Sequence, residues 1–387
     1  MHQLPRPEAL HDNLVRPVFS MSGLREELCA AIRLARERVY ADFYILGGRS
    51  GEMVAEALAE RYRAGLDVRV LLDRNLGTFW PLRPEALPVK ALLDRRGVPV
   101  RLAATRRGGR MVRSRVVDHN KLVVLDGRTG YVGSTNLTDA ASRLEDLAIR
   151  LEGPVVRQIE EQFRYDWALA NSPEGDNGRS SSDLLFDASM EGLLANGSAA
   201  GLSTVRMVGV GPGRSTLAGA LLNAINSTRQ SLELHVHWLD AVDPVDALIR
   251  AHRRGVAVRV IVDPLKVGRY LPAGWPAPRT PRGMFNALAV HALRRAGVPV
   301  RFARLEPAII GYHMKVAIFD GGLVVTGTAN WTRRSLTLLT ETVLEIAGGP
   351  VVGQLRRWFD SQWDTRTEEA RVGLEARAYS ALVNLLL

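Results

Sequence analysis

The chain has 387 residues, which is too many for one small domain and enough for two domains. With 46% hydrophobic and 24% charged residues it can bury a sizeable core, and its single cysteine, Cys29, excludes an intrachain disulfide. The formal net charge of +10 favours an anionic partner, such as a nucleic acid, a phosphate-bearing substrate or an anionic membrane surface, although a solvated basic surface explains it equally well.

The N-terminus lacks the basic and apolar segments of a signal peptide. No apolar run approaches the roughly 18–20 residues that span a bilayer. We therefore expect a cytoplasmic protein that is either soluble or peripheral at the inner face of the membrane.

The chain carries one order of segments twice, at an offset near 190–200 residues. Each copy begins with apolar residues at helical spacing and continues with short β-type runs, of which VRVLLD and VRVIVD are typical of strands buried on both faces. The matching segments, in chain order, are residues 23–38 and 214–229, 37–46 and 230–239, 64–75 and 254–265, and 92–103 and 292–303.

This alternation predicts an α/β fold of two similar halves, each with a mixed or mostly parallel sheet flanked by helices. The stretch 171–201 is rich in Ser, Gly and Asn and predicts a connection between the halves. We place the boundary near residue 190, which gives an N-terminal half of residues 1–190 and a C-terminal half of residues 191–387.

Each half contains one H-x-K-x-x-x-x-D pattern, followed by a short motif with a hydroxyl residue and an asparagine. In both copies the asparagine follows the histidine by 17 positions, at 119 and 136 and at 313 and 330. The residues are His119, Lys121, Asp126, Ser134 and Asn136 in the first copy, and His313, Lys315, Asp320, Thr328 and Asn330 in the second.

The spacing has a direct chemical meaning. Residues two apart on a strand face the same side, so the histidine and lysine of each motif project together. A strand returning beside the first can deliver the hydroxyl and the amide at its end. Each half then offers an imidazole, an ammonium group and neutral hydrogen-bond donors to a phosphate, and the matched second copy argues against coincidence.

These paired motifs resemble the HKD motifs of the phospholipase D superfamily, and the resemblance covers roughly residues 15–365. Further stretches, Glu145 to Trp167 and Asn330 to Trp363, resemble the cardiolipin synthases. The resemblance implies two α/β halves related by a pseudo-two-fold axis, with both motifs in one site at their interface. Because one chain supplies both motifs, no obligate oligomer is needed.

The resemblance implies a phosphodiesterase or phosphatidyltransferase that forms a covalent phosphohistidine. One histidine attacks phosphorus and the other protonates the leaving oxygen. By analogy with the family, His119 attacks, although the sequence is symmetric on this point. Two lysines would neutralise the phosphate oxygens, so we expect neither a metal nor another cofactor.

The remaining motif residues are expected to hold the substrate, orient the histidines or support the fold. Ser134, Thr328, Asn136 and Asn330 would complete the phosphate cradle. The resemblance implies that Glu341 orients His119 and that Asp146 orients His313, with Glu145 as the alternative to Asp146. Asp126 and Asp320 are expected to be structural.

Two further features bear on the substrate. His235 and His237 form an H-x-H pair without a third metal ligand nearby, so we place His237 at the pocket edge as a substrate contact, with ordinary strand packing as the alternative. Residues 105–115 carry five arginines, among them Arg106, Arg107 and Arg110, and form either an anion-binding lip or a solvated loop.

The counterpart of this arginine segment, residues 304–312, is apolar. One basic and one apolar lip suit an amphiphilic phospholipid better than a DNA strand. The sequence therefore predicts a cardiolipin synthase-like enzyme with a phospholipid substrate. The alternatives are a nuclease of the same superfamily that cleaves DNA or RNA, and a scaffold with a degenerate site, against which the two intact motifs argue.

Overall fold

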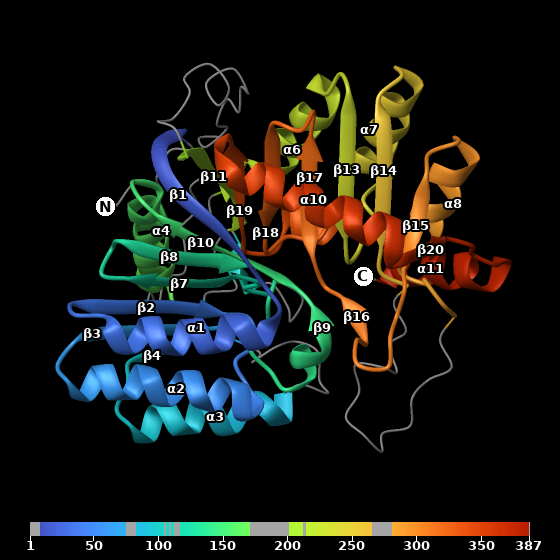
Figure 1. Ribbon diagram of the computed structural model, residues 1–387. Helices are drawn as coiled ribbons and strands as arrows, with labels where there is room; N and C mark the ends of the chain where they lie inside the picture. The colour runs from blue at the N-terminus through green and yellow to red at the C-terminus, as the bar shows by residue number, and fades with distance from the viewer. Residues whose placement is uncertain are drawn as a thin grey trace.

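The structure is a computed structural model that describes residues 8–74, 83–103, 106–107, 110–111, 117–170, 201–211, 214–264 and 281–386. A 16-stranded mixed sheet runs through the molecule with helices on both faces (Figure 1). The strand order is β20-β15-β14-β13-β17-β18-β19-β11-β1-β10-β8-β7-β2-β3-β4, with β12 paired to β11.

The elements of the first half precede the stretch 171–200, which lies outside the described residues. They are β1 (Leu10–Phe19), α1 (Met21–Leu34), β2 (Arg38–Phe43), α2 (Gly48–Arg63), β3 (Asp67–Leu72), α3 (Arg83–Arg95), β4 (Val100–Leu102), β5 (Arg106–Arg107), β6 (Arg110–Met111), β7 (Lys121–Leu125), β8 (Thr129–Gly133), the 3-10 helix η2 (Ala140–Arg143), β9 (Leu144–Glu145), β10 (Leu147–Glu152) and α4 (Val155–Leu169).

The elements of the second half repeat the order of the main strands and helices, differ in the short strands, and add a C-terminal strand and helix. They are β11 (Ser203–Gly211), β12 (Arg214–Ser215), α6 (Leu217–Ser227), β13 (Ser231–Val236), α7 (Val242–Arg253), β14 (Ala257–Val262), α8 (Ala287–Arg295), β15 (Val300–Ala303), β16 (Gly311–Tyr312), β17 (Lys315–Phe319), β18 (Leu323–Gly327), α9 (Arg333–Thr337), β19 (Glu341–Ala347), α10 (Gly349–Thr365), β20 (Thr367–Glu369) and α11 (Leu374–Leu386).

The two halves of the sheet mirror each other in strand order. In each, three parallel strands (β2, β3, β4 or β13, β14, β15) are followed toward the centre by antiparallel strands, beginning with β7 or β17. At the centre β1 and β11 pair antiparallel and join the halves. The predicted α/β fold of two similar halves is confirmed, whereas the boundary near residue 190 lies outside the described residues.

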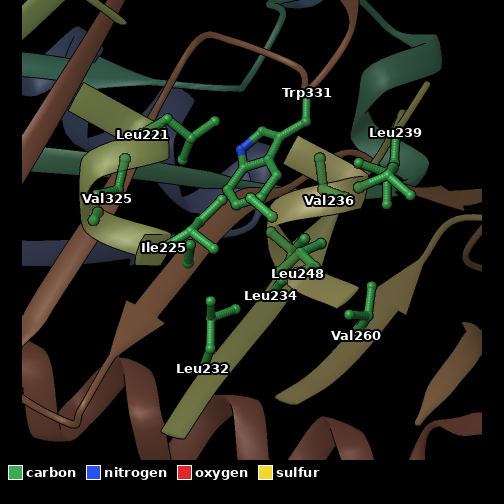
Figure 2. Packing of buried hydrophobic residues seen from close by; sticks show 14 of the residues in the cluster. Leu221, Ile225, Leu232, Leu234, Val236, Leu239, Leu248, Val260, Val325 and Trp331 are labelled. Atoms are coloured by element: carbon green, nitrogen blue, oxygen red, sulfur yellow. The ribbon is translucent and has the colours of Figure 1, made fainter. Parts of the chain in front are cut away.

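Buried apolar side chains form three clusters. One packs against α1, α2 and α3. A second packs against α6, α7 and α8 and includes Leu234, Val260 and Trp331 (Figure 2). The third includes Phe163 of α4 and Phe359 of α10 and draws strands from both halves. Helix α4 contacts β11 and α10 contacts β1, so each half is held against the central strand of the other.

The motif aspartates fix where the first helix of each half ends. The carboxylate of Asp126 accepts the backbone N–H groups of Arg36, Glu37 and Arg38, and Asp320 accepts those of residues 229–231. Both aspartates have a left-handed backbone, with φ of 54° and 49°. The predicted helices 23–38 and 214–229 therefore end earlier, at Leu34 and Ser227, because these N–H groups bond to a carboxylate instead of continuing the helix.

Candidate active site

The two motif histidines lie just before the inner strands β7 and β17, on segments that cross to the opposite half. The backbone N–H of His119 donates to the carbonyl of Thr340 at 2.9 Å, and that of His313 donates to the carbonyl of Glu145 at 2.8 Å. The short strands β9 and β16 run parallel at this crossing (Figure 1). Each histidine is thus bound to the residue that precedes the acid of the other half.

A buried carboxylate from the opposite half contacts the Nδ1 atom of each histidine. Nδ1 of His119 lies 3.0 Å from both carboxylate oxygens of Glu341, and Nδ1 of His313 lies 3.1 Å from Oδ2 of Asp146. Both carboxylates are fully buried. A carboxylate on Nδ1 favours the proton there and leaves Nε2 as the reactive nitrogen.

Glu145, the alternative partner for His313, is directed elsewhere. Its carboxylate lies 3.2 Å from the Arg366 guanidinium, and only its backbone carbonyl meets the histidine segment. The ion pair with Arg366 ties the second half to the segment that carries Asp146. The structure therefore favours Asp146 over Glu145 as the partner of the His313 ring.

Both motif lysines are buried beside the histidines. Nζ of Lys121 donates to the carbonyl of His119 at 2.7 Å, and Nζ of Lys315 donates to that of His313 at 2.6 Å. Each bond uses one of three ammonium protons, so the other two remain for phosphate oxygens. Burial is the main cause that lowers the pKa of each histidine, and the lysine of the opposite motif lowers it further: Lys315 acts on His119, and Lys121 acts on His313. Both motifs therefore belong to one electrostatic site.

The motif hydroxyls bind the acids, which differs from the expectation that they complete the phosphate cradle. The hydroxyl of Ser134 donates to Asp146, and that of Thr328 donates to Glu341 at 2.5 Å. Each oxygen also accepts the backbone N–H of the residue after the acid, at 3.3 Å for Ser134 and 2.9 Å for Thr328. With their protons on carboxylates, these hydroxyls have none left for a phosphate.

The motif asparagines follow the hydroxyl residues at the ends of β8 and β18. The amide oxygens of Asn136 and Asn330 are buried and have no hydrogen-bond partner within the described part of the chain. A buried amide oxygen without a partner is uncommon. Because this oxygen only accepts, a donor such as a hydroxyl group would complete its hydrogen bonding, whereas phosphate oxygens could be bound only by the amide N–H groups.

The residues that flank the histidines differ between the halves. The Tyr44 ring contacts the His119 ring at 4.7 Å between centroids, and the His237 ring contacts the His313 ring at 4.6 Å. Nδ1 of His237 lies 3.1 Å from the carbonyl of Tyr312. The structure thus places His237 beside the site. Tyr44 has the equivalent position, which the match of residues 37–46 to 230–239 indicates.

His235, the other residue of the H-x-H pair, packs between aromatic rings. Its imidazole is fully buried, 5.7 Å from the Tyr312 ring and 5.4 Å from that of Trp358. Burial lowers its pKa to about 3, so the ring is neutral. Among the described residues no group of three or more His, Cys, Asp or Glu side chains could hold a metal ion.

The two predicted lips have different outcomes. The arginine segment forms a short antiparallel pair, β5 and β6, and the side chains of Arg106, Arg107 and Arg110 lie outside the described part of the structure. In the apolar segment 304–312, Ile310 is buried in the core of the first half, and its N–H donates to the carbonyl of Arg143 at 2.8 Å. This segment therefore joins the halves, which corrects the idea that all of it is a lip.

Burial sets the protonation of the bases in the site. It lowers the pKa of His119 to about 4, against the attraction of Glu341, and that of His313 well below its usual value, with Lys315 adding to the effect. Burial also lowers the pKa of Lys121 to about 8 and that of Lys315 to about 7. Both imidazoles are therefore neutral near pH 7, and a bound anionic phosphate would raise all four pKa values.

The two acids have different protonation behaviour. Burial raises the pKa of Asp146 to about 6, although Lys315 opposes the change. Burial also acts to raise the pKa of Glu341, but the neighbouring His119, Lys121 and hydrogen bonds lower it overall. The two His–carboxylate pairs are therefore alike in geometry and unlike in electrostatics.

The sequence model described as "Cardiolipin synthase, PLD-like domain" matches residues 28–167 and 221–363, one span in each half. The chain belongs to this phospholipase D-like family. Both spans contain one complete H-x-K-x-x-x-x-D motif together with its asparagine.

A curated relative and a solved structure each match most of the length of this chain. Cardiolipin synthase A of Pseudomonas entomophila (strain L48) is 26% identical over 382 residues, covering 95% of this chain and 72% of the relative. The phosphatidylserine synthase of Haemophilus influenzae Rd KW20 superposes with a TM-score of 0.67 at 16% identity, covering 98% of this chain and 94% of that one.

A polyphosphate kinase from Porphyromonas gingivalis also superposes, with a TM-score of 0.57 at 14% identity, covering 96% of this chain and 53% of that one. At such identities the likeness concerns the fold alone, and one fold serves several substrates. In the described part of this phospholipase D-like protein, no helix is both long and apolar enough to cross a membrane.

Proposed function

We propose that this protein is a phospholipase D-like phosphodiesterase or phosphatidyltransferase that acts on phospholipids through a covalent phosphohistidine. One observation carries the proposal: His119 and His313 each bind a buried carboxylate of the opposite half, with two buried lysines alongside. The similarity to cardiolipin synthase A and the match to the cardiolipin synthase-like family model support a phospholipid substrate.

In the first step, Nε2 of one histidine attacks phosphorus and the bond from phosphorus to the leaving oxygen breaks. We assign the attack to His119. His313, protonated once the anionic substrate is bound, gives its proton to the leaving alcohol. Glu341 and Asp146 hold the Nδ1 protons and stabilise the positive charge that each ring carries in turn.

In the second step, His313 removes a proton from the acceptor hydroxyl, the acceptor oxygen attacks phosphorus, and the bond from phosphorus to His119 breaks. Water as acceptor gives hydrolysis, and an alcohol such as glycerol or another lipid gives phosphatidyl transfer. Lys121 and Lys315 neutralise the non-bridging oxygens in both steps. Ser134 and Thr328 do not contact the substrate in this mechanism. Their hydroxyls bind Asp146 and Glu341 and so hold these carboxylates against the histidines.

A phospholipid headgroup and the surface of an anionic bilayer both carry negative charge. The net charge of +10 on the protein would attract both of them. We propose that the protein binds the anionic membrane surface peripherally, with the arginine segment 105–115 contributing. A nuclease activity has the same chemistry and would draw on the same positive charge, so the decisive test compares the two substrates directly.

The test uses purified protein with mixed phospholipid vesicles, with and without glycerol, and with single- and double-stranded DNA, in buffer containing EDTA. Mass spectrometry then identifies the products. Headgroup release in EDTA, with a new phosphatidyl product when glycerol is present, is the expected result. Rapid DNA cleavage with intact phospholipids would replace the lipid assignment with the nuclease.

A further inference from the structure

The residues between the histidine and the lysine of each motif break the symmetry of the site. Asn120 in the first half and Met314 in the second are both fully buried. The residues that follow the two acids differ in the same sense, with Thr342 after Glu341 and Leu147 after Asp146. The crossing beside His119 thus has a polar pair, one residue from each half, where the crossing beside His313 has two members of the shared apolar core.

The polar pair bonds across the interface between the halves. The hydroxyl of Thr342 donates to Oδ1 of Asn120 at 2.9 Å. Nδ2 of Asn120 donates in turn to Oδ2 of Asp42 at 3.1 Å, inside the first half. Asn120 is therefore anchored on both sides, and its two chain neighbours are His119 and Lys121.

The same pair is connected to the acid. The backbone N–H of Thr342 donates to Oγ1 of Thr328 at 2.9 Å, and the Thr328 hydroxyl donates to Glu341, which accepts Nδ1 of His119. A continuous run of buried hydrogen bonds therefore leads from Asp42 to His119. On the other side the corresponding run stops at the apolar side chain of Leu147.

Buried hydrogen bonds are directional and restrict geometry, whereas apolar contacts between similar shapes tolerate small shifts. Within the described residues the run ends at Asp42, whose Oδ1 atom has no hydrogen-bond partner. Displacing a reacting group by about 1 Å can cost on the order of a hundredfold in rate. Without the bond between Asn120 and Thr342, the backbone hydrogen bonds of Thr340 to Val117 and His119 would remain. Apart from the contact of His119 with Glu341 itself, however, no side-chain bond within the described residues would fix the segment of His119 against the strand of Glu341. The His313 side has no such constraint to lose.

We propose that Asn120 and Thr342 are positioning residues whose buried hydrogen bond holds His119 and Glu341 in register across the interface, a restraint that His313 and Asp146 lack. The inference rests on the proposed function for its kinetic test alone. The competing explanation is that the pair only satisfies the buried carboxyl of Asp42 and contributes to folding.

Three variants separate these explanations. Thr342→Val removes the hydroxyl and keeps the shape, and Thr342→Ser keeps the hydroxyl. The double variant Asn120→Met/Thr342→Leu copies the apolar pair of Met314 and Leu147 beside His313. The double variant avoids an unsatisfied amide oxygen on Asn120 but removes the donor to Oδ2 of Asp42, whereas Thr342→Val keeps that bond. The two variants therefore disturb folding in different ways, so one is expected to fold even if the other does not. Met314→Leu is the matched control at the equivalent position.

With a soluble phosphodiester as substrate, we expect Thr342→Val and the double variant to lower kcat about tenfold or more, with KM within about twofold. Thr342→Ser should restore most of kcat, and Met314→Leu should keep the wild-type value. Wild-type kcat in a folded double variant would overturn the proposal, because the pair would then serve only folding.

A second readout needs no substrate, so it stands even if the wild-type protein cleaves no phosphodiester and the proposed function fails. Nitrogen-15 NMR of the histidine rings reports the Nδ1–H bound to a carboxylate. In Thr342→Val, or in the double variant, the Nδ1–H signal of His119 should broaden or shift while that of His313 stays. An unchanged His119 signal would contradict the inference.

Discussion

At the scale of single residues, the site consists of two His–carboxylate pairs that are contributed crosswise by the halves. His119 with Glu341 and His313 with Asp146 have nearly equal distances, 3.0 and 3.1 Å. In the proposed mechanism attack and leaving-group protonation are separate tasks, so neither pair can replace the other. We therefore expect each histidine to be indispensable for turnover.

Replacing His119 or His313 by Ala should abolish multiple turnover, since general acid–base catalysis alone contributes about 10²–10⁴-fold. With a substrate whose leaving group needs no protonation, His313→Ala should still form the phosphohistidine on His119 and stall there. Mass spectrometry of the quenched protein detects the adduct. Near-normal turnover in either variant would refute the shared site, and an adduct on His313 in His119→Ala would reverse the two roles.

The pH dependence follows from the two histidines, Asp146 and the two lysines. His119 must be neutral to attack, and His313, whose pKa burial lowers well below its usual value, must be protonated to release the alcohol. As the pH falls through about 6, Asp146 is protonated and no longer supports the charge on His313. As the pH rises through about 7, Lys315 loses its charge, and Lys121 follows near 8. We expect kcat/KM, which reports the free enzyme, to have its maximum near or below about pH 6 and to fall toward high pH as His313 and then the lysines lose their protons.

This profile is measured with a phosphodiester that stays a monoanion across the range, so the substrate does not contribute. The variant Asp146→Asn cannot titrate and should lose the acid limb together with most of its activity. A flat profile between about pH 5 and pH 9 would show that these groups do not control the reaction.

At the scale of secondary-structure elements, the H-x-K strands have two different ends. The histidine end enters the site, and the aspartate end closes the turn between the first helix and the first parallel strand of each half. Asp126 accepts three backbone N–H groups there. Burial acts to raise the pKa of Asp126, but these three hydrogen bonds outweigh burial and lower the pKa overall. The motif aspartate thus acts on the fold, one strand length from the chemistry.

Asp126→Ala should lower the free energy of unfolding by about 1–3 kcal/mol, because hydrogen bonds to a charged group are lost and the left-handed backbone is strained for Ala. Asp320→Ala should behave alike. Urea unfolding measures the change, and kcat of the folded fraction should stay near wild type. A large fall in kcat without loss of stability would give these aspartates a role in catalysis instead.

At the scale of the whole molecule, one continuous sheet and a shared apolar core hold the halves together. The segment around Ile310 and the crossed helices α4 and α10 strengthen this interface. Because the site lies on the interface, its geometry depends on contacts throughout both halves. An anionic surface would attract the molecule as a whole through its net positive charge.

Neutralising Arg106, Arg107 and Arg110 together should weaken action on anionic vesicles and reduce its dependence on salt, since exposed charges are screened within about 8–10 Å at physiological ionic strength. Hydrolysis of a small soluble phosphodiester should change much less. The comparison uses vesicles with and without anionic lipid at several salt concentrations. An equal loss on the soluble substrate would place the arginines in the site itself.

The sequence by itself determined the repeat, the α/β class, the family and the motif residues, because strand periodicity and residue spacing are local properties. It also indicated the partners of His119 and His313 through the resemblance. The early ends of the first helices were not predictable, since the carboxylates that capture those N–H groups lie about 90 residues away.

Only the tertiary structure decided what the hydroxyls, the flanking rings and the buried pairs contact. Ser134 and Thr328 bind carboxylates because the antiparallel strands bring each one beside an acid of its own half. Asn120 and Thr342 are 222 residues apart, and nothing local in the sequence distinguishes their hydrogen bond from the apolar pair beside His313. Long-range strand pairing creates such contacts, and it therefore decides how two similar halves become unequal.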